Sequence, residues 1–387
     1  MTTKSPSSIK LLNIGWVGQG DFGDEVMAYV LRKYLSGLGF DKITYYQHGK
    51  YPAYRAENDL EISIMHSFNA PAWQKRWLDF FLLRKYNIVI IGGGSVLHSY
   101  NSIAWKLAII NKIKENNRQS LAACVGISVG PLKTAVEENI CAELFNKIDI
   151  ALMRDNHSAE LAKRLTSQKE IYASLDSSLL LPLVATTELA AAKKVVTEED
   201  LVGVMFIKKK GEEEIFSRYK FFDKFQAIIN KIILSGKRVL LFNLYVGDAY
   251  PDIELNNLLK NNSKYKDKIE IHYFNGDIFR TISQFCRCRH IISMRLHGII
   301  ISYMLGIPFI SLGYNEKNRN FCSSVNYSSK MAFDFYGLKN LDGVYSAMDE
   351  LFEKGVDLYR GSPPVVEASK KVNENFNILK DRLINFL

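Results

Sequence analysis

The sequence predicts an α/β protein with two domains, each a parallel β-sheet covered by helices on both faces. Short apolar segments alternate with longer helical patterns, as in sheets of this kind. The alternation stops near residues 184–200 and then starts again. The chain has 387 residues, which exceeds the size at which a single hydrophobic core stops growing. Two α/β domains are therefore expected.

The first half of the chain contains seven strand patterns and four helix patterns. The expected strands are Leu11–Val17, Lys42–Tyr46, Glu61–Met65, Ile88–Ile91, Leu121–Ile127, Ile150–Met153 and Ile171–Ala173, and the expected helices are 24–36, 101–116, 135–147 and 156–166. Pro182 closes this series, and Thr186–Asp200 is rich in Ala, Lys and Glu without strand character. We expect the first domain to cover residues 1–184.

The second half repeats the alternation with fewer strands. The expected strands are Val202–Ile207, Arg238–Asn243, Ile269–Phe274, His290–Ser293 and Phe309–Leu312, and the expected helices are 215–235, 277–286 and an apolar segment at 299–305. We expect the second domain to cover 200–362. The last segment, 363–387, has a helical pattern and is expected to pack back onto the first domain.

Composition limits the classes of function. Hydrophobic residues make up 47% and charged residues 24%, as in soluble globular proteins. The net charge of +9 suits an anionic substrate or an acidic membrane surface. Lys208-Lys209-Lys210 is followed by three glutamates, and no basic stripe is interleaved with stacking aromatics, so nucleic acid is not an expected partner.

Cysteine usage and the N-terminus indicate a reducing compartment. Five cysteines scattered through apolar segments do not suggest a disulfide framework. Cys286-Arg287-Cys288 with His290 lacks the second ligand pair of a structural zinc site, so no metal is expected. The first ten residues carry no signal-length apolar core, and no run reaches the ~20 apolar residues of a spanning helix. We expect a cytoplasmic protein, at most peripheral at the inner face of the membrane.

The most informative motif is Ser293-Met294-Arg295-Leu296-His297-Gly298, where a strand ends and an apolar helix begins. Residues at such a corner face the ligand crevice, and the N-terminus of the helix favours anions. Arg295 stands between apolar residues, and burying an arginine is costly without an anionic partner. Arg295 and His297 are therefore candidate site residues. The alternative is a solvated arginine beside a core histidine.

Three further motifs stand at predicted strand ends. Gly18, Gly20 and Gly23 match a dinucleotide fingerprint, but no acidic residue ends the second strand, so no nicotinamide cofactor is expected. Gly92-Gly93-Gly94 is either a backbone cradle for an anion or a sugar, or a tight turn. Arg154 precedes a helix for which Asp155 is the expected N-cap, and Lys317 follows the strand next to Arg295.

Taken in order, these motifs resemble those of the polysaccharide pyruvyltransferase family. The resemblance covers roughly residues 10 to 325 and rests on Asp21-Phe22-Gly23-Asp24-Glu25, Gly92–Gly94, Gly126-Ile127-Ser128-Val129-Gly130-Pro131, Arg154-Asp155-Asn156-His157-Ser158, Asp176, Ser293-Met294-Arg295-Leu296-His297, Gly306-Ile307-Pro308 and Tyr314-Asn315-Glu316-Lys317. Asp21 departs from the family's usual Asn, and its extra negative charge would alter which sugar is accepted if this position touches the donor or the acceptor. Asp176-Ser177-Ser178 departs from Asp-Pro-Ala.

The resemblance implies two Rossmann-like domains that face a cleft, similar to the two-domain GT-B-type glycosyltransferases. It also implies transfer of pyruvate from phosphoenolpyruvate to hydroxyls of a sugar in a cell-surface polysaccharide or lipid-linked oligosaccharide precursor, which forms a ketal without any cofactor. The first domain would hold the acceptor and the second the donor.

The implied reaction and the chemistry of each side chain together suggest a role for each candidate residue. An arginine fork matches phosphate and carboxylate, so Arg295 would bind the donor with support from Arg154 or Lys317. His297 would donate a proton to the enol methylene. Asp24 or Asp176 would deprotonate the acceptor hydroxyl, although a helix start or a turn also explains these aspartates. Gly20 and the Gly92, Gly93 and Gly94 backbones would approach the substrate.

Two other functions stay open. A nucleotide-sugar-dependent glycosyltransferase of the same shape is one, although no two glutamates in this chain stand eight positions apart, as the retaining enzymes' Glu-x7-Glu signature requires. An inactive glycan-binding relative is the other.

A basic and aromatic segment, Trp73–Lys85, is either a membrane contact or a packed helix. The sequence indicates neither the acceptor sugar nor the oligomeric state.

Overall fold

A computed structural model describes residues 9–46, 61–65, 82–93, 97–168, 170–208, 211, 213–247, 252–354 and 365–386 of this chain, with 61–65 and 354 described by their backbone. The chain divides into two compact units. The first unit contains Met1–Gln19, Asp24–Val184 and Ser369–Leu387, and the second contains Gly20–Gly23 and Ala185–Ala368.

The first unit is built on seven parallel strands in the order β3-β2-β1-β4-β5-β6-β7. The strands are β1 (Leu11–Ile14), β2 (Lys42–Tyr46), β3 (Glu61–Met65), β4 (Ile88–Gly92), β5 (Leu121–Ile127), β6 (Ile150–Met153) and β7 (Ile171–Ala173). Every strand predicted in this half is present. The main difference is that β1 ends at Ile14 and not at Val17, because the chain turns at once toward Gly18, whose φ is positive.

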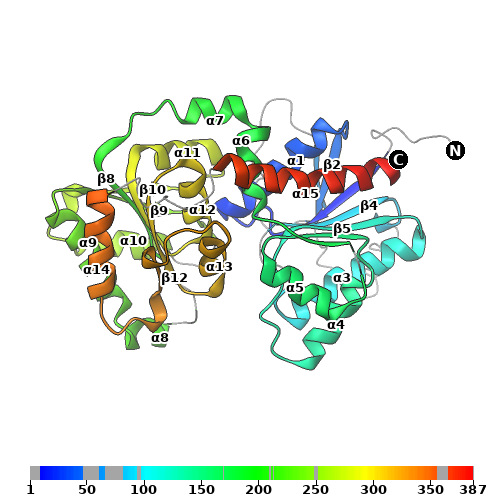
Figure 1. Ribbon diagram of the computed structural model, residues 1–387, viewed down its shortest axis with the longest axis horizontal. Helices are drawn as coiled ribbons and strands as arrows, with labels where there is room; N and C mark the ends of the chain where they lie inside the picture. The colour runs from blue at the N-terminus through cyan, green and yellow to red at the C-terminus, as the bar shows by residue number, and fades with distance from the viewer. Residues whose placement is uncertain are drawn as a thin grey trace. The chain divides into compact units, whose positions relative to one another are not determined.

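Helices cover both faces of this sheet. They are α1 (Phe22–Gly37), α3 (Tyr100–Asn116), α4 (Ala135–Phe145), α5 (Asn156–Leu165), the 3₁₀ helix η2 (Ser177–Leu180), α6 (Leu181–Val184) and α15 (Val365–Phe386). Figure 1 shows α1 and α15 on one face and α3 and α4 on the other. A parallel sheet covered in this way buries both of its faces, which explains why β4 and β5 are apolar along their whole length.

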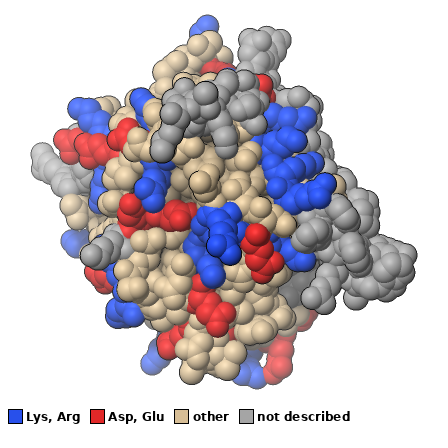
Figure 2. Space-filling model, turned by 90° about the vertical axis from the view of Figure 1, so that its right-hand side faces the viewer, with Lys and Arg blue, Asp and Glu red and all other residues tan. Residues whose placement is uncertain are grey.

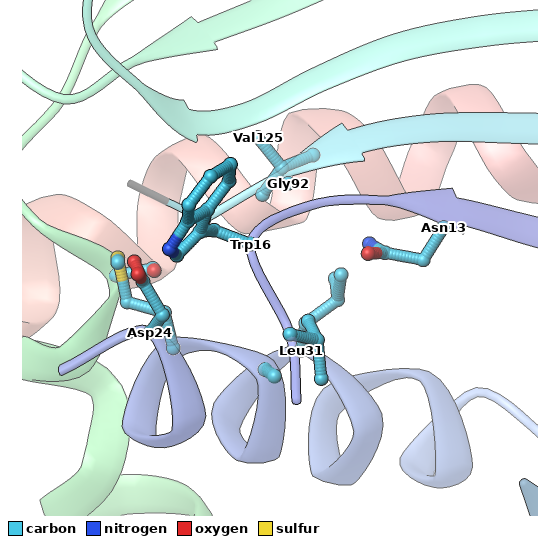
Figure 3. Close-up of a pocket in the computed structure, with 11 residues that line it drawn as sticks. Asn13, Trp16, Asp24, Leu31, Gly92 and Val125 are labelled. Atoms are coloured by element: carbon cyan, nitrogen blue, oxygen red, sulfur yellow. The ribbon is translucent and has the colours of Figure 1, made fainter. Parts of the chain in front are cut away.

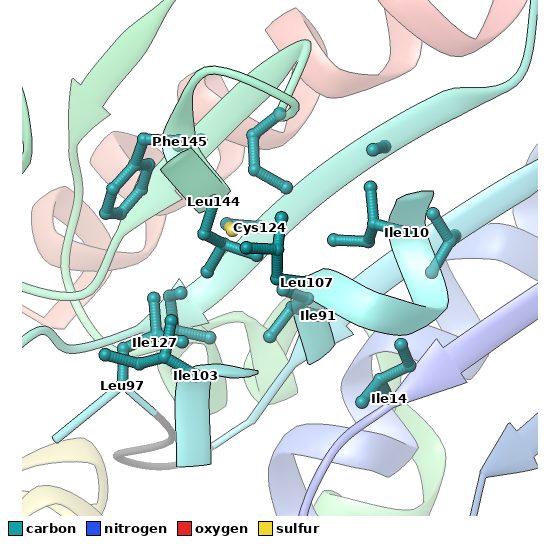
Figure 4. Packing of buried hydrophobic residues seen from close by; sticks show 14 of the residues in the cluster. Ile14, Ile91, Leu97, Ile103, Leu107, Ile110, Cys124, Ile127, Leu144 and Phe145 are labelled. Atoms are coloured by element: carbon teal, nitrogen blue, oxygen red, sulfur yellow. The ribbon is translucent and has the colours of Figure 1, made fainter. Parts of the chain in front are cut away.

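The core beneath α3 and α4 follows from helical periodicity. Ile103, Leu107 and Ile110 recur at spacings of four and three residues, so they lie on one face of α3 and point at the sheet. Figure 4 shows them packed with strand side chains such as Ile91 and Ile127. Each such side chain contributes about 1.5–3 kcal/mol on burial, so this layer fixes the ends of β4 and β5 firmly.

The C-terminal helix α15 belongs almost entirely to the first unit. Ser369 donates a hydrogen bond from Oγ to the Leu179 carbonyl at 2.6 Å, and Tyr34 of α1 donates from Oη to the Phe376 carbonyl at 2.8 Å. Phe376 also packs edge-on against the Tyr34 ring, with centroids 4.9 Å apart. Helix α15 thus packs against α1 and η2 within the first unit.

The second unit is built on six parallel strands in the order β10-β9-β8-β11-β12-β13. They are β8 (Glu198–Met205), β9 (Arg238–Asn243), β10 (Ile269–Tyr273), β11 (Cys288–Ser293), β12 (Phe309–Gly313) and β13 (Ala332–Asp334). The sequence pattern misses β13, a three-residue edge strand, and starts β8 four residues late, because its first residues are charged.

The helices of this unit are α7 (Thr186–Ala192), α8 (Glu213–Arg218), α9 (Phe221–Leu234), α10 (Asp252–Asn261), η3 (Lys266–Lys268), α11 (Ile278–Arg287), α12 (Leu296–Leu305), α13 (Glu316–Ser324), η4 (Ser329–Met331), η5 (Phe335–Gly337) and α14 (Asp342–Lys354). One helix was predicted over 215–235. The structure has two, because Lys220 adopts a left-handed conformation that interrupts the helix.

A closed ring of ion pairs explains the charged start of β8. Glu198 accepts from Arg238 at 3.1 Å and from Arg287 at 2.8 Å, and Glu270 accepts from Arg287 at 2.9 Å and also pairs with Arg238. The four side chains are partly exposed, so each pair contributes at most about 1 kcal/mol. Together they join the starts of β8, β9 and β10.

Residues 20–23 belong to the second unit, although the sequence pattern assigns them to the first domain. Phe22 N–H donates to the Leu244 carbonyl at 2.9 Å, and Val246 N–H donates to the Gly20 carbonyl at 3.0 Å. The buried Phe22 ring packs against Phe274 and Phe285, with centroids 5.6 and 6.0 Å away. A four-residue segment has no periodicity, so its place in the second unit cannot be read from the pattern.

The surface carries charges of both signs. Figure 2 shows the side of the molecule that lies on the right in Figure 1, where several basic side chains form a strip at the upper right and further basic and acidic side chains are interspersed over the rest. None of the described helices is both long and apolar enough to cross a membrane. Residues 73–81 of the basic, aromatic segment, for which a membrane contact and a packed helix were both open, lie outside the described residues.

A buried lysine in α3 makes stability depend on pH. Lys106 is 3% exposed, and burial lowers the pKa of its ammonium from 10.5 to about 7. Between pH 7 and 10.5 the unfolded chain therefore binds one proton more than the folded chain, and stability rises with pH. We expect Lys106→Met to be more stable than the parent at pH 7, with an advantage that shrinks by about 2 kcal/mol at pH 9.

Urea unfolding of both proteins at the two pH values measures this difference. Both proteins contain the same cysteines, so the contribution of cysteine ionisation to the pH dependence of stability cancels in the comparison. An advantage of Lys106→Met that is the same at pH 7 and pH 9 would contradict the assignment.

Candidate functional site

In both sheets the direction in which strands are added reverses at the strand that comes first in the sequence, β1 in the first unit and β8 in the second. In the first unit β1 has β2 on one side and β4 on the other, and in the second unit β8 lies between β9 and β11. In open α/β sheets, ligands bind outside the carboxyl ends of the strands where the order reverses. Each unit therefore has one expected binding position, at the ends of β1 and β4 and at the ends of β8 and β11.

In the second unit this position is occupied by a buried ion-pair cluster around Arg295. Its guanidinium donates from Nε to Asp252 Oδ2 at 3.0 Å, and Nη2 contacts the same oxygen. Nη1 lies 3.5 Å from Asp21 Oδ2, and the guanidinium carbon lies 5.6 Å from the centre of the Tyr245 ring. Asp252, the first residue of α10, is 0% exposed. The side chain of Arg295 is thus held in one orientation.

The electrostatics of this cluster favour a permanently charged arginine. Burial by itself lowers the pKa of Arg295, but Asp252 and then Asp21 outweigh burial and raise that pKa above its ordinary value. Burial raises the pKa of Asp252, while the attraction of Arg295 opposes this rise. Removing one partner of such a pair leaves an uncompensated buried charge, which costs about 3–5 kcal/mol.

The turn between β11 and α12 explains the spacing of the Ser-x-Arg-x-His-Gly motif. Ser293 Oγ accepts from the Arg295 N–H at 3.0 Å and donates to the Arg295 carbonyl at 2.9 Å, which closes the turn locally. A Cβ on Gly298 would lie 2.2 Å from Ser293 Oγ, so glycine is required there. The turn leaves Arg295 as N-cap of α12 and places His297 in its first turn.

His297 packs against the glycine-rich segment. A Cβ on Gly23 would lie 1.8 Å from His297 Nδ1, so the imidazole ring lies directly on the Gly23 backbone. Gly23 N–H donates to Asp21 Oδ1 at 2.9 Å, and Asp21 in turn pairs with Arg295. Two motifs separated by 274 positions in the sequence therefore form one site within the second unit, which the sequence pattern did not predict.

Lys317 lies in the first turn of α13, which follows β12, the neighbour of β11. The adjacent Asn318 donates to the Met294 carbonyl at 3.1 Å, so this turn is held against the residue that precedes Arg295. A pocket of about 190 Å³ opens beside it, lined by Tyr314, Asn315, Glu316, Arg319, Phe333, Asp334 and their neighbours. Lys317 thus lies on the same edge of the sheet as Arg295 and His297.

In the first unit the expected position is a small pocket at the ends of β1, β4 and β5. Trp16, Asp24, Gly92, Gly93 and Ser177 line it together with Asn13 and apolar side chains of α1. Figure 3 shows Trp16 and Asp24 on one side of this pocket and Asn13 on the other. The cavity volume is about 10 Å³, which is room for about one water-sized group.

The predicted glycines have different structural roles. Gly92 ends β4, and a Cβ there would lie 2.8 Å from Asn13 Nδ2. Gly93 has a positive φ and lines the pocket of the first unit. Gly94 lies outside the described residues. Gly20 also has a positive φ, but it belongs to the second unit, where its carbonyl accepts from Val246.

Arg154 and Asp176 lie together in the first unit, with Nη1 3.7 Å from Oδ2. Both are nearly buried, at 6% and 1% exposed. Asp176 is the N-cap of η2 and accepts from Ser178 N–H at 2.9 Å. Asp155 accepts from Ser158 N–H at 2.8 Å as the N-cap of α5, the role the sequence predicts for it. These contacts hold the ends of β6 and β7 in place.

Several site residues were missed from the sequence. Asp252 resembles an ordinary helix start, and nothing local indicates that an arginine 43 residues later is its partner. Tyr245 follows β9 without any motif. Asn13 interrupts an otherwise apolar strand, and this polar residue at the end of β1 was the available signal. Among the described residues no group of three or more His, Cys, Asp or Glu is arranged to hold a metal ion.

Comparison with known proteins identifies a family and a fold. A family model described as polysaccharide pyruvyl transferase matches residues 21–316, about three quarters of the chain. That range contains the Asp21–Glu25 motif, the Arg295 and His297 corner, and all strands from β2 to β12. A search of curated protein sequences finds no match.

Solved structures with the same fold include UDP-GlcNAc 2-epimerases. The enzyme from Methanocaldococcus jannaschii superposes with a TM-score of 0.62 at 12% identity, covering 95% of this chain and 99% of that one. A putative UDP-N-acetylglucosamine 2-epimerase from Listeria monocytogenes gives 0.63 at 10% identity, covering 97% and 96%. Anabaena HepE, solved with UDP and glucose, gives 0.59 at 9% identity, covering 97% and 99%. The fold is therefore the GT-B type with two Rossmann-like domains.

The contact between Gly23 and His297 can be tested by adding one methyl group. We expect Gly23→Ala to displace the His297 ring, because the new Cβ would overlap Nδ1, while the helix itself prefers alanine by about 1 kcal/mol. The imidazole proton signals in NMR spectra report the displacement. Gly37→Ala, at the other end of α1, meets nothing within 4 Å and is the matched control. Identical His297 signals in Gly23→Ala and the parent would refute the contact.

The Arg295 cluster predicts that replacing the buried Asp252 lowers the free energy of unfolding far more than replacing an exposed aspartate. Asp252→Asn keeps the shape of the side chain but removes a buried charge that faces Arg295, so we expect a loss of about 3 kcal/mol in the free energy of unfolding. Asp223→Asn, on the exposed face of α9, should change it by less than about 0.5 kcal/mol. Urea unfolding measures both, and equal losses would show that the buried pair does not stabilise the fold.

Proposed function

Because the chain belongs to the polysaccharide pyruvyl transferase family, we propose that it transfers pyruvate from phosphoenolpyruvate to two hydroxyls of a sugar and so forms a pyruvyl ketal. The sugar would be part of a cell-surface polysaccharide or a lipid-linked oligosaccharide precursor. The observation that carries the proposal is the turn after β11, which lies where the strand order of the second sheet reverses. There the guanidinium of Arg295 pairs with Asp21, and the ring of His297 lies on Gly23.

The donor would bind in the second unit. Phosphoenolpyruvate carries a phosphate and a carboxylate, and both suit arginine, lysine and the N-terminus of a helix. The N-terminus of α12 and Lys317 in the first turn of α13 lie on one edge of the sheet. The contact between Arg295 Nη1 and Asp21 is 3.5 Å, longer than a strong charge-assisted hydrogen bond, so a donor oxygen can compete for Nη1 while Asp252 keeps the side chain in place.

His297 would supply the proton that starts the reaction. Protonation of the enol methylene carbon turns it into a methyl group and leaves an electrophilic centre at the neighbouring carbon. A sugar hydroxyl oxygen bonds to that carbon and gives up its proton to a base, and phosphate leaves with the electrons of its carbon–oxygen bond. A second hydroxyl oxygen then bonds to the same carbon, gives its proton to a base and closes the ring. A histidine beside the anchored donor suits the first step, since histidines gain and lose a proton near neutral pH.

The acceptor would bind in the first unit. Asp24 lines the pocket there with Gly92 and Gly93, so it is our candidate for the base. Asp176 is 1% exposed and is engaged by Ser178 and Arg154, which favours a structural role for Asp176 in shaping this side of the unit. Arg154, 6% exposed, would then act on the substrate by holding that loop.

A second candidate function comes from the structural neighbours. Two of them are UDP-GlcNAc 2-epimerases and a third was solved with UDP and glucose, so a nucleotide sugar is the competing donor. The test must therefore compare the two kinds of donor on the same protein.

Isothermal titration with phosphoenolpyruvate, UDP-sugars and GDP-sugars makes that comparison. We expect saturable binding of phosphoenolpyruvate that weakens about tenfold in Lys317→Met, because a cation near the anion is lost. Lys330→Met, an exposed lysine in the same unit, should bind like the parent. His297→Gln should keep the affinity but lose at least ~100-fold in phosphate release with a panel of methyl glycosides as acceptors.

Binding of a nucleotide sugar without binding of phosphoenolpyruvate would replace pyruvyl transfer with glycosyl transfer. Full turnover in His297→Gln would remove His297 as the proton donor.

A further inference from the structure

The pocket of the first unit contains a buried polar atom that requires a hydrogen-bond donor. Asn13, at the carboxyl half of β1, is 1% exposed, and its Oδ1 has no hydrogen-bond partner among the described residues. A buried amide oxygen without a partner costs about 1–3 kcal/mol. Asn13 lines the pocket, and its amide lies against Gly15 and Gly92, where a Cβ would approach to 3.1 and 2.8 Å. A bound group that donates a hydrogen bond would remove this cost.

The charges around the pocket disfavour an anion. Asp24 lines it, and the neighbouring Glu25 accepts from the Gly18 N–H at 2.7 Å, so two carboxylates stand in the first turn of α1. Among the described residues that line the pocket there is no lysine or arginine. An ionised carboxylate has no proton to donate to Asn13 Oδ1, and it would be repelled by the Asp24 carboxylate, as would a phosphate anion. An uncharged sugar carries several hydroxyls, so one can donate to Asn13 Oδ1 and another to Asp24.

An exposed aromatic ring stands at the mouth of the pocket. Trp16 is 51% exposed although it follows a fully buried strand, and Figure 3 shows its indole beside the Asp24 carboxylate. A large ring left in water is unfavourable unless a ligand covers it. A pyranose has an apolar C–H face and a rim of hydroxyls, so it can lie on the indole while its hydroxyls meet the polar groups beside it.

The size of the cavity defines how such a ligand would sit. A volume of about 10 Å³ holds one water-sized group and not a sugar ring. The ring must therefore stay outside, on Trp16, with one hydroxyl inserted toward Asn13. We propose that Trp16, Asn13 and Asp24 form the subsite for an uncharged sugar of the acceptor, with Trp16 as its stacking platform. This inference rests on the proposed function, because it assigns the acceptor to a specific surface of the first unit.

Saturation-transfer NMR on the full chain tests the subsite without knowledge of the natural acceptor. The probes are the methyl glycosides of galactose, glucose, mannose and N-acetylglucosamine at millimolar concentration. We expect at least one to bind, and its affinity to fall about tenfold in Trp16→Ala, as for other buried aromatic contacts. Trp16→Phe keeps a ring and should retain most of the binding. Tyr100→Ala removes another exposed ring of the first unit that does not line the pocket, and should bind like the parent.

The possible outcomes test the sugar subsite independently of the proposed pyruvyl transfer. Equal binding by Trp16→Ala and the parent, or no binding of any glycoside, would overturn the subsite, even where phosphoenolpyruvate binds and reacts. Displacement of the glycoside by inorganic phosphate would also overturn it, because it would make the pocket an anion site. Glycoside binding that depends on Trp16 in a protein that fails to bind phosphoenolpyruvate would support the subsite while removing the pyruvyl donor. Circular dichroism of each variant verifies that the fold is intact.

Discussion

The buried ion pair between Arg295 and Asp252 is the interaction on which the second unit's site depends. It joins the turn after β11 to the start of α10, and through Asp21 it also holds the glycine-rich segment. Neither charge is stable there without the other, because each is almost completely removed from water. Local hydrogen bonds of Ser293 close the turn beside this pair, and His297 lies against Gly23 of the same glycine-rich segment.

Most of the fold could be predicted from the sequence because its signals are local. The strands of the first unit are apolar runs of the right length, and β13 was missed because three edge residues carry no pattern. The site was only partly predictable. That Arg295 needs an anion follows from its apolar neighbours, but the protein itself supplies Asp252 from a distant segment. Gly23 was singled out as part of a glycine pattern, but nothing in the sequence indicates that this glycine makes room for the His297 ring.

The two sheets share the order of their first six strands, to which the first sheet adds β7, but they differ in the chemistry at their reversal points. The first presents oxygen acceptors, an exposed indole and no described cation among its lining residues. The second presents a fixed guanidinium, two carboxylates and a lysine at the start of α13. A common fold therefore hosts one position suited to a neutral polyol and one suited to charged groups, and side chains alone make the difference.

The path of the chain has a consequence for how such an enzyme can change. It passes from one unit to the other at 19–20, returns at 23–24, leaves again at 184–185 and returns at 368–369. Neither unit is a continuous piece of sequence, so recombination at a single junction would strip each unit of an essential segment. A single crossover therefore cannot exchange one whole unit for another, whereas substitution of individual side chains at a strand-reversal point leaves the path of the chain unchanged.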